Sequence, residues 1–323
     1  MAPLRAALRV PYKTVSNVDI PTDIYLPTAA SQPCPVLIMI HGGAFMLGSA
    51  SINNKDQIAD CVERGWIVMA IEHRLCPGVN LLEGPMADVR DALAFAQEGS
   101  LAKALVETWT GTVDNKRIMV MGTSSGGHLA LSTAFNTPHP PLAILDFYGA
   151  KHFASPFWTQ RMSKMPPAFF EPRPQSEIDA LNLEQTTLIG GASLEGQAPD
   201  PTAPDPKIRQ AFAMHQIATG NVVKTIWPAQ PDRLESIDPL LNVSKSWPPV
   251  CIVHGTADSM IPMSLSKDLE KRMHEEGVEV AFIEVEGEEH TFAGKMQKGS
   301  QTWNTQRQGF DWLEKIVQRS SGS

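Results

Sequence analysis

The apolar residues of this chain gather in short unbroken runs, which are typical of strands buried on both faces of a parallel sheet. Residues 12–18 and 22–26 instead alternate apolar and polar positions and predict two antiparallel edge strands separated by Asp19-Ile20-Pro21. Helical patterns follow most of the buried runs. This alternation predicts an α/β fold with a mostly parallel central sheet flanked by helices. The buried runs lie at residues 35–40, 66–71, 118–121, 142–147, 250–254 and 280–285.

The alternation of strands and helices stops between residues 149 and 236, in a segment rich in proline, methionine and aromatic residues. An insertion between late strands of such a sheet commonly covers the binding site. We therefore predict a single domain over residues 1–323 with a cap inserted at residues 149–236. Two roles stay open for the aromatic and methionine side chains of this cap, because they can line a substrate pocket or pack the cap onto the body. The residues assigned to substrate binding here are Phe157, Trp158 and Met162.

The buried run at residues 118–121 leads directly into Gly122-Thr123-Ser124-Ser125-Gly126, and a helical pattern follows. Gly-x-Ser-x-Gly between a strand and a helix is the sequence of a nucleophile elbow, in which the serine is exposed above the sheet. A serine held in a strained turn needs neighbours without side chains, so that strand and helix can approach each other. A turn without chemistry also satisfies this short motif, so its meaning depends on the rest of the chain.

Three further segments supply what a serine nucleophile needs. The first buried strand ends in His41-Gly42-Gly43-Ala44-Phe45, the strand at residues 250–254 leads into a turn that carries Asp258, and His290 follows the last strand. The order Ser, Asp, His is the one found in α/β-hydrolases. On these motifs the chain resembles the α/β-hydrolase superfamily, in the esterase branch of hormone-sensitive-lipase-like and arylformamidase-like enzymes. The resemblance covers about residues 15–318 and implies an α/β-hydrolase fold.

The resemblance assigns Ser124 as nucleophile, His290 as general base and Asp258 as the acid that orients it. Serine is a weak nucleophile at neutral pH and needs a base positioned by a third group. Asp232 and Asp238 compete for the role of the acid. Both precede the strand at residues 250–254, whereas sites of open α/β sheets lie beyond the carboxyl ends of their strands, which favours Asp258.

The resemblance also implies an oxyanion hole made by the backbone N–H groups of Gly42, Gly43 and Ser125. Two positions depart from the usual pattern, because Ala44 stands in place of a third glycine and Ser125 in place of the commoner alanine. The donors are backbone groups, so neither change removes the hole. Phe45 and Phe292 are further candidates for the wall of the substrate pocket.

Composition limits the partners and the cellular compartment that we expect for this chain. With 42% hydrophobic and 19% charged residues the chain can bury a large core, and a formal net charge of −8 without clustered Lys and Arg argues against nucleic acid as a partner. We expect no membrane span, because no segment approaches ~20 apolar residues, and no signal peptide, because Arg5, Arg9 and Pro11 interrupt the amino-terminal segment. Four irregularly spaced cysteines favour a reducing compartment, and we expect a cytoplasmic protein.

The motifs together predict a serine hydrolase that cleaves a carboxylic ester or thioester of a small apolar or aromatic acyl substrate through an acyl-enzyme. We expect no cofactor and no metal, because no cluster of metal ligands and no phosphate-binding glycine loop is visible in the sequence. Three alternatives stay open: an arylformamidase-like amide hydrolase, a hydrolase that releases or trims an acyl product in secondary-metabolite biosynthesis, and a non-catalytic receptor on the same fold. The intact His290 counts against the receptor. Substrate and oligomeric state are not readable from the chain.

Overall fold

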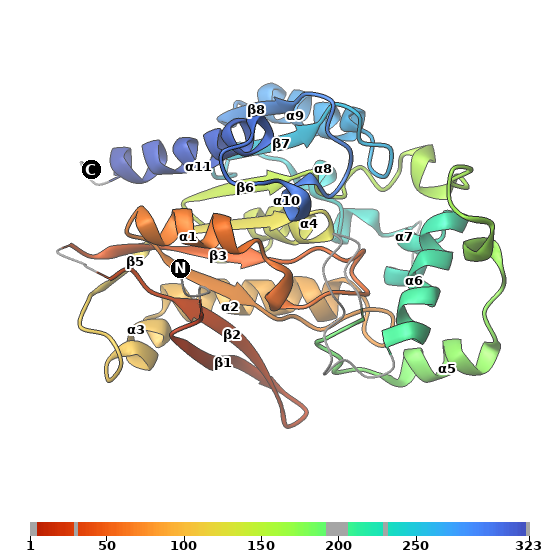
Figure 1. The fold of residues 1–323 in the computed structure, drawn as a ribbon, viewed down its shortest axis with the longest axis horizontal. Coiled ribbons are helices and arrows are strands. Elements are labelled where there is room, and N and C mark those ends of the chain that lie inside the picture. Colours follow the sequence, from red (N-terminus) through yellow and green to blue (C-terminus); the bar gives the residue numbers. More distant parts are fainter. Residues whose placement is uncertain (1–4, 29–31, 192–205, 229–231, 321–323) are drawn as a thin grey trace.

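The computed structural model describes residues 5–28, 32–191, 206–228 and 232–320, and its centre is one eight-stranded sheet (Figure 1). The strand order is β1-β2-β4-β3-β5-β6-β7-β8. β1 pairs antiparallel with β2, and β2 with β4, whereas all other neighbours are parallel. The predicted mostly parallel α/β sheet is therefore confirmed. The strands are β1 Leu8–Val15, β2 Val18–Tyr25, β3 Cys34–Ile40, β4 Ile67–Ile71, β5 Val113–Thr123, β6 Ala143–Phe147, β7 Val250–Gly255 and β8 Val280–Val285.

Helices cover both faces of the sheet, which is why its central strands are apolar at almost every position. Successive residues of β3 point to opposite faces: Ile38 belongs to the core that includes Val89 of α2, and Leu37 to the core that includes Ile58 of α1 and Leu313 of α11. The helices are α1 Lys55–Glu63, α2 Ala87–Gln97, α3 Ser100–Leu105, α4 Ser125–Leu131, α5 Gln175–Leu183, α6 Pro206–Thr219, α7 Val222–Ile226, α8 Pro239–Asn242, α9 Met263–Glu276, α10 Phe292–Lys295 and α11 Gln301–Ser320.

The edge hairpin is present, but its turn lies earlier than predicted. Ser16 and Asn17 form it with φ angles of 49° and 63°, and Pro21 lies within β2, opposite Pro11 of β1. Asn is one of the few residues that adopt such left-handed angles readily, which suits a tight hairpin turn. The ladder between β2 and β4 begins only at Thr22, so the missing N–H of Pro21 is tolerated.

The described residues from 149 to 236, which we call the β6–β7 insertion, lie at the carboxyl ends of the strands and carry α5, α6 and α7 (Figure 1). They contact the loops that follow β3 and β4. Arg209 of α6, 1% exposed, donates hydrogen bonds to the carbonyls of Met46 (3.2 Å) and Cys76 (2.8 Å), and Gly190 pairs with Gly48. Residues 192–205 and 229–231 of the predicted cap lie outside the described residues.

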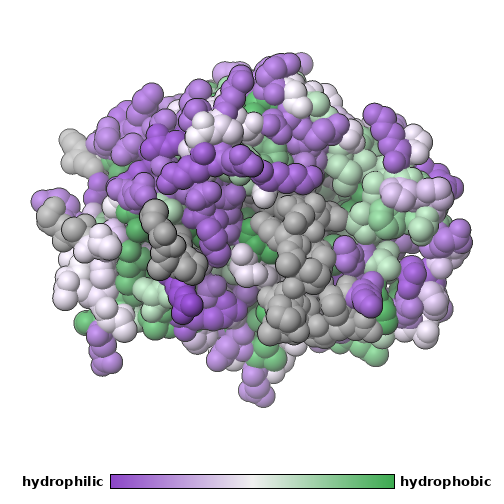
Figure 2. Space-filling model, in the orientation of Figure 1, coloured by the Kyte–Doolittle hydropathy of each residue, from purple (hydrophilic) through white to green (hydrophobic). Residues whose placement is uncertain are grey.

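Hydrophilic residues cover most of the face shown in Figure 2, with small hydrophobic patches between them. Among the described residues, the exposed large apolar side chains Val106, Leu183 and Leu241 belong to separate segments of the chain. Single exposed apolar residues are ordinary for a folded protein. Among the described residues, no helix combines the length and the apolar character needed to cross a membrane.

Candidate active site

The turn between β5 and α4 has the geometry of a nucleophile elbow. Ser124 has φ 54° and ψ −121°, a combination that L-residues rarely adopt. A Cβ atom on Gly122 would lie 2.0 Å from the carbonyl oxygen of Gly126, and one on Gly126 would lie 2.3 Å from the carbonyl oxygen of Ile40. Both contacts are far too short, so only glycine permits the approach of strand and helix that the turn requires.

Ser124, His290 and Asp258 lie in hydrogen-bonding contact. His290 Nε2 is 2.9 Å from Ser124 Oγ, and His290 Nδ1 is 2.7 Å from Asp258 Oδ2. The carboxylate accepts only, so Nδ1 carries the proton and the unprotonated Nε2 accepts from the serine hydroxyl. Each residue follows the carboxyl end of a different strand, β5, β8 and β7, and all three are buried with less than a tenth of their surface exposed.

Asp258 receives hydrogen bonds on both carboxylate oxygens. Oδ1 accepts from the backbone N–H groups of Met260 (2.9 Å) and Ile261 (2.8 Å), while Oδ2 lies 2.7 Å from His290 Nδ1 and 3.1 Å from His254 Nε2. Burial raises the pKa of this carboxyl, but the attraction of His290 in its protonated form and the hydrogen bonds from the two histidines and Ile261 outweigh it. The pKa of Asp258 therefore lies well below its usual range.

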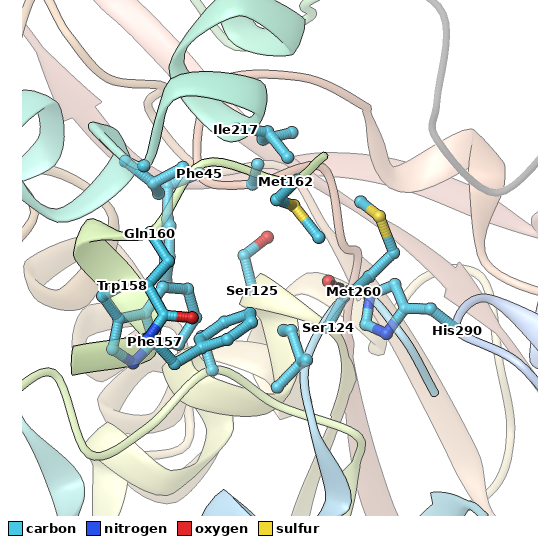
Figure 3. Close-up of a pocket in the computed structure, with 15 residues that line it drawn as sticks. Phe45, Ser124, Ser125, Phe157, Trp158, Gln160, Met162, Ile217, Met260 and His290 are labelled. Carbon is cyan, nitrogen blue, oxygen red and sulfur yellow. Dashed lines mark hydrogen bonds between the residues drawn. The ribbon is translucent and has the colours of Figure 1, made fainter. Parts of the chain in front are cut away.

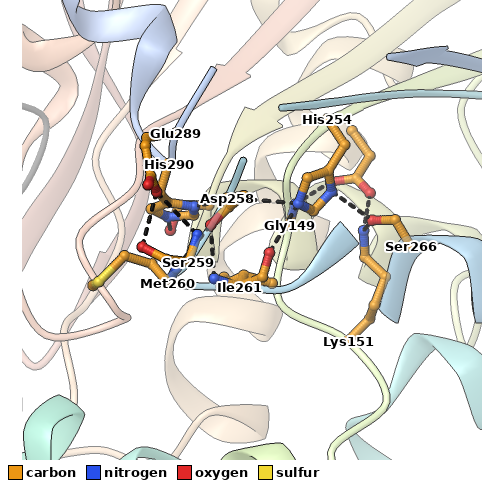
Figure 4. Close-up of polar contacts among 12 residues, drawn as sticks. Gly149, Lys151, His254, Asp258, Ser259, Met260, Ile261, Ser266, Glu289 and His290 are labelled. Carbon is orange, nitrogen blue, oxygen red and sulfur yellow. Dashed lines mark hydrogen bonds and ion pairs between the residues drawn. The ribbon is translucent and has the colours of Figure 1, made fainter. Parts of the chain in front are cut away.

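Asp258 also faces His254, and a series of buried polar groups beyond His254 fixes the tautomer of its ring (Figure 4). Lys151 Nζ pairs with Asp146 and donates to Ser266 Oγ (2.9 Å), which lies 2.8 Å from His254 Nδ1. Lysine has donors only, so Ser266 accepts from it and gives its own hydroxyl proton to Nδ1. His254 then carries its proton on Nε2, where it faces Asp258 and the carbonyl of Ile261.

The competing carboxylates have other surroundings. Asp238 is fully buried and accepts hydrogen bonds from the backbone N–H groups of His152 (3.0 Å), Phe153 (2.5 Å) and Leu240 (3.0 Å) at the start of α8. These bonds tie the β6–β7 insertion to α8, which is a structural role. Asp232 is exposed. Neither carboxylate is hydrogen-bonded to His290, whose partner is Asp258.

The loop after β3, in which the sequence predicts the oxyanion donors, has positive φ angles at three successive residues. Gly43 has φ 129°, and a Cβ on it would lie 2.1 Å from the carbonyl oxygen of Leu47. Ala44 (φ 53°) and Phe45 (φ 66°) adopt left-handed angles although they carry side chains. Ala44 thus takes the backbone shape expected of the third glycine that it replaces.

His41 holds the start of this loop. Its Nδ1 donates to the carbonyl of Gly42 (2.8 Å), and its ring stacks on His73 at 4.3 Å between centroids. A Cβ atom on Gly126 would lie 2.5 Å from the carbonyl oxygen of His41, so the loop packs directly against the elbow. Burial and the neighbouring His73 lower the pKa of His41 well below its usual value, which keeps the ring neutral and suits a supporting role.

A cavity opens beside Ser124 and is walled mainly by apolar side chains (Figure 3). Four of the predicted substrate-binding residues line it, namely Phe45, Phe157, Trp158 and Met162. Ser124, Ser125 and His290 border it as well. The other lining residues, which the sequence did not assign to the substrate pocket, are Ala44, Ala150, Gln160, Ile217, Gly220, Val222, Met260 and Ile261.

Phe292 lies elsewhere. Its ring packs against Tyr148 (5.0 Å between centroids) and Phe147 (6.2 Å), in the core between the sheet and α11. The residue is 2% exposed and is not part of the cavity wall, so its assignment to substrate binding is wrong for this cavity. Its position beside His290 in the sequence does not bring it into the cavity, because Thr291 between them has a left-handed φ of 68° and α10 then begins at Phe292.

Solved structures share this fold. A protein of unknown function from Staphylococcus aureus superposes with a TM-score of 0.68 at 19% identity, covering 96% of this chain and 99% of that chain. Esterase 2 of Thermogutta terrifontis, phosphonylated by cyclosarin, gives a TM-score of 0.62 at 18% identity, covering 97% and 95%. At such low identity these structures establish the α/β-hydrolase fold.

Curated relatives are much longer proteins. The non-reducing polyketide synthase Preu6 of Preussia isomera is 32% identical over 94% of this chain, and pkbA of Emericella nidulans is 29% identical over 95%. The chain spans only 14% of the length of either relative. The family model named BD-FAE matches residues 22–156 and 210–273, which is more than half of the chain. The chain therefore belongs to the BD-FAE family, an esterase family of the α/β-hydrolases.

Proposed function

We propose that this protein is a serine hydrolase that cleaves the carboxylic ester of a small apolar or aromatic acyl group through an acyl-enzyme. The hydrogen-bonded series Ser124–His290–Asp258 beside an apolar cavity is the observation that supports it. The esterase-like fold supports ester hydrolysis in general. We further propose that the β6–β7 insertion acts as a cap, since Phe157, Trp158 and Met162 from it wall the cavity.

In the first step, Ser124 Oγ attacks the carbonyl carbon while His290 Nε2 takes the hydroxyl proton. Asp258, held ionised by its hydrogen bonds, stabilises the imidazolium that forms. The negative charge that develops on the carbonyl oxygen is stabilised by backbone N–H groups, for which we propose Gly42, Gly43 and Ser125.

The tetrahedral intermediate then collapses, and the leaving alcohol takes the proton from His290. A water molecule repeats the sequence on the acyl-enzyme: it loses a proton to His290, attacks the carbonyl carbon, and frees the acid while Ser124 regains its proton. No group beyond the three side chains and the backbone donors is required.

Labelling by a fluorophosphonate probe tests this proposal. We expect covalent modification of Ser124 in the wild type, and a fall in kcat of roughly 10⁵ to 10⁶ for Ser124→Ala or His290→Ala on a short aryl ester, because the members of such a series act as one unit. Ser132→Ala and His139→Ala are matched controls outside the site and should keep both label and turnover. Wild-type turnover in either site variant would contradict the assignment, and a wild type that takes no label and cleaves no ester would favour the receptor.

A second candidate is thioester hydrolysis that releases or trims an acyl product. The alignment of almost the whole chain with part of non-reducing polyketide synthases supports it. The mechanism is unchanged except that the leaving group is a thiol. Comparing kcat/KM for benzoyl N-acetylcysteamine and phenyl benzoate separates thioester from ester activity, and comparing phenyl formate with formanilide separates ester from arylformamidase-like activity. Within each pair the acyl group is the same and the bond that breaks differs.

A further inference from the structure

Ser125, the residue after the proposed nucleophile, carries a hydroxyl that has no part in the proposed mechanism. Its side chain points into the cavity beside Ser124 (Figure 3). The residue is 2% exposed, and within the described part of the chain Oγ has no hydrogen-bond partner. A buried hydroxyl without a partner is unfavourable, so a pocket that keeps one is suited to a ligand that supplies the partner.

Two nearby hydroxyl groups show what a buried serine or threonine on this segment usually does. Ser132 Oγ donates to the carbonyl of Leu129 at 2.7 Å, and Thr133 Oγ1 to the carbonyl of Ala130 at 2.6 Å. Both bonds run back to the preceding helical turn. Ser125 is the first residue of α4 and has no helical turn before it, so this internal partner is missing at its position.

The place of the hydroxyl relative to the reacting carbonyl limits what it can bind. The backbone nitrogen of Ser125 is a proposed oxyanion donor, and Oγ belongs to the same residue, a few covalent bonds away. A group that meets Oγ must therefore lie close to the acyl carbonyl rather than at the far end of the acyl chain. The rest of the wall favours a flat ring, since Phe157 and Trp158 stand edge to face at 5.1 Å and the thioethers of Met162 and Met260 adapt to its outline.

We propose that the Ser125 hydroxyl is a specificity determinant that hydrogen-bonds an oxygen substituent ortho to the carbonyl of an aromatic acyl group. The inference rests on the proposed hydrolase function and names the substrate class of the same site, 2-hydroxyaryl acyl esters or thioesters. A hydroxyl both donates and accepts, so a phenolic oxygen in this position satisfies it whichever way the proton points. Gln160 also borders the cavity, but it is exposed and meets water without a ligand.

The test compares wild type and Ser125→Ala on phenyl esters of 2-hydroxybenzoate, 4-hydroxybenzoate and benzoate. The variant keeps the backbone N–H, and alanine is the commoner residue at this position in the resembling enzymes. We expect kcat/KM for the 2-hydroxy ester to fall about tenfold, while the other two esters change less than about twofold. Intrinsic reactivity differences among the esters cancel, because each ester is compared with itself in two proteins.

Ile217→Val is the matched control, since it trims the same cavity without touching a polar group, and it should change all three esters by a similar factor. An equal loss on all three esters in Ser125→Ala would overturn the inference, because it would make the hydroxyl an additional oxyanion donor. Unchanged values, or a loss confined to the 4-hydroxy ester, would overturn it too.

Failure of the proposed function looks different, because no ester is then cleaved and Ser124 takes no fluorophosphonate label. In that case, calorimetry tests the role of the Ser125 hydroxyl. It measures the binding of 2-hydroxybenzoate and of benzoate to the wild-type and Ser125→Ala proteins. We expect the Kd for benzoate divided by the Kd for 2-hydroxybenzoate to be about tenfold higher in wild type than in Ser125→Ala. Equal preference in the two proteins would contradict the role of the hydroxyl.

Discussion

At Asp258 burial and hydrogen bonding act in opposite directions, and stability measured against pH reports which one prevails. Its pKa is well below the usual value, so the ionised form stabilises the fold above the usual carboxyl range, and this contribution is lost as the pH falls below about 4. Asp258→Asn cannot ionise. We therefore expect the difference in free energy of unfolding between wild type and Asp258→Asn to narrow by about 1 kcal/mol between pH 6 and pH 3, as measured by urea denaturation.

Asp238 supplies a control of opposite sign. Burial raises its pKa in spite of the hydrogen bonds from Phe153, Leu240 and His152. Its contribution to stability is therefore complete below about pH 4 and is lost as the pH rises through its higher folded pKa. The free energy of unfolding of wild type, minus that of Asp238→Asn, should therefore increase as the pH falls. If the stability difference from wild type changed with pH in the same direction for Asp258→Asn and Asp238→Asn, the opposite pKa shifts of the two carboxyl groups would be contradicted.

Residue identities at the site were predictable where the chemistry demands one residue type in one local pattern. The Gly122 and Gly126 requirement follows from the tight turn, and the choice of Asp258 over Asp238 follows from the position of each relative to β7. Phe292 shows the limit of such arguments. A sequence neighbour of His290 can enter the cavity or the core, and the left-handed turn at Thr291 that decides between them leaves no signal in the pattern of apolar residues.

At the scale of elements, buried strands were predictable because runs such as residues 66–71 and 250–254 leave no face for water. The hairpin turn was misplaced because Pro21 is a strong turn former in general, yet it fits β2 outside the β4 ladder. The cavity wall was only partly predictable. Ile217 of α6 and Met260 after β7 come together in space, and no local sequence signal pairs them.

The short 3₁₀ segment Pro156–Thr159 combines the two roles that the sequence left open for its aromatic pair. Trp158 is 8% exposed, donates from Nε1 to the carbonyl of Lys151 (3.1 Å) and packs edge to face on Phe153. Phe157 is only half-buried and lines the cavity. We expect Phe157→Ala to lower kcat/KM for bulky aryl acyl esters about tenfold or more and to leave acetate esters nearly unchanged, since apolar contact helps only a substrate long enough to reach it.

Trp158→Ala is the comparison for that experiment. It should lower the melting temperature and reduce turnover of acetate and aryl esters alike, because it removes a packed ring and a buried hydrogen bond. Steady-state kinetics on an acetate and a benzoate ester, with thermal denaturation of both variants, measures the difference. A Phe157→Ala protein that loses both activities equally and melts earlier would assign this ring to packing as well.

At the scale of the whole molecule, the site depends on how the β6–β7 insertion is held against the sheet. Ser124, Asp258 and His290 follow the carboxyl ends of sheet strands, whereas Phe157 and Ile217, which line the cavity, belong to the insertion. Buried strands and the preference for right-handed crossovers limit the possible orders of the sheet. The seating of the insertion follows from contacts between residues far apart in the chain, which a pattern of apolar positions does not specify.

Arg209 makes the clearest of these contacts. Its guanidinium is buried, donates to the carbonyls of Met46 and Cys76 and pairs with Glu184, so it fixes α6 to the loops after β3 and β4. We expect Arg209→Met to lower the free energy of unfolding by about 2 kcal/mol and to raise KM for aryl esters more than it lowers kcat, because α6 also carries a cavity wall. Hydrogen exchange should quicken in α6 and in residues 42–48, whereas Lys207→Met, an exposed change on the same helix, should leave it unaltered. Exchange that stays at the wild-type rate in Arg209→Met would mean that other contacts seat the insertion.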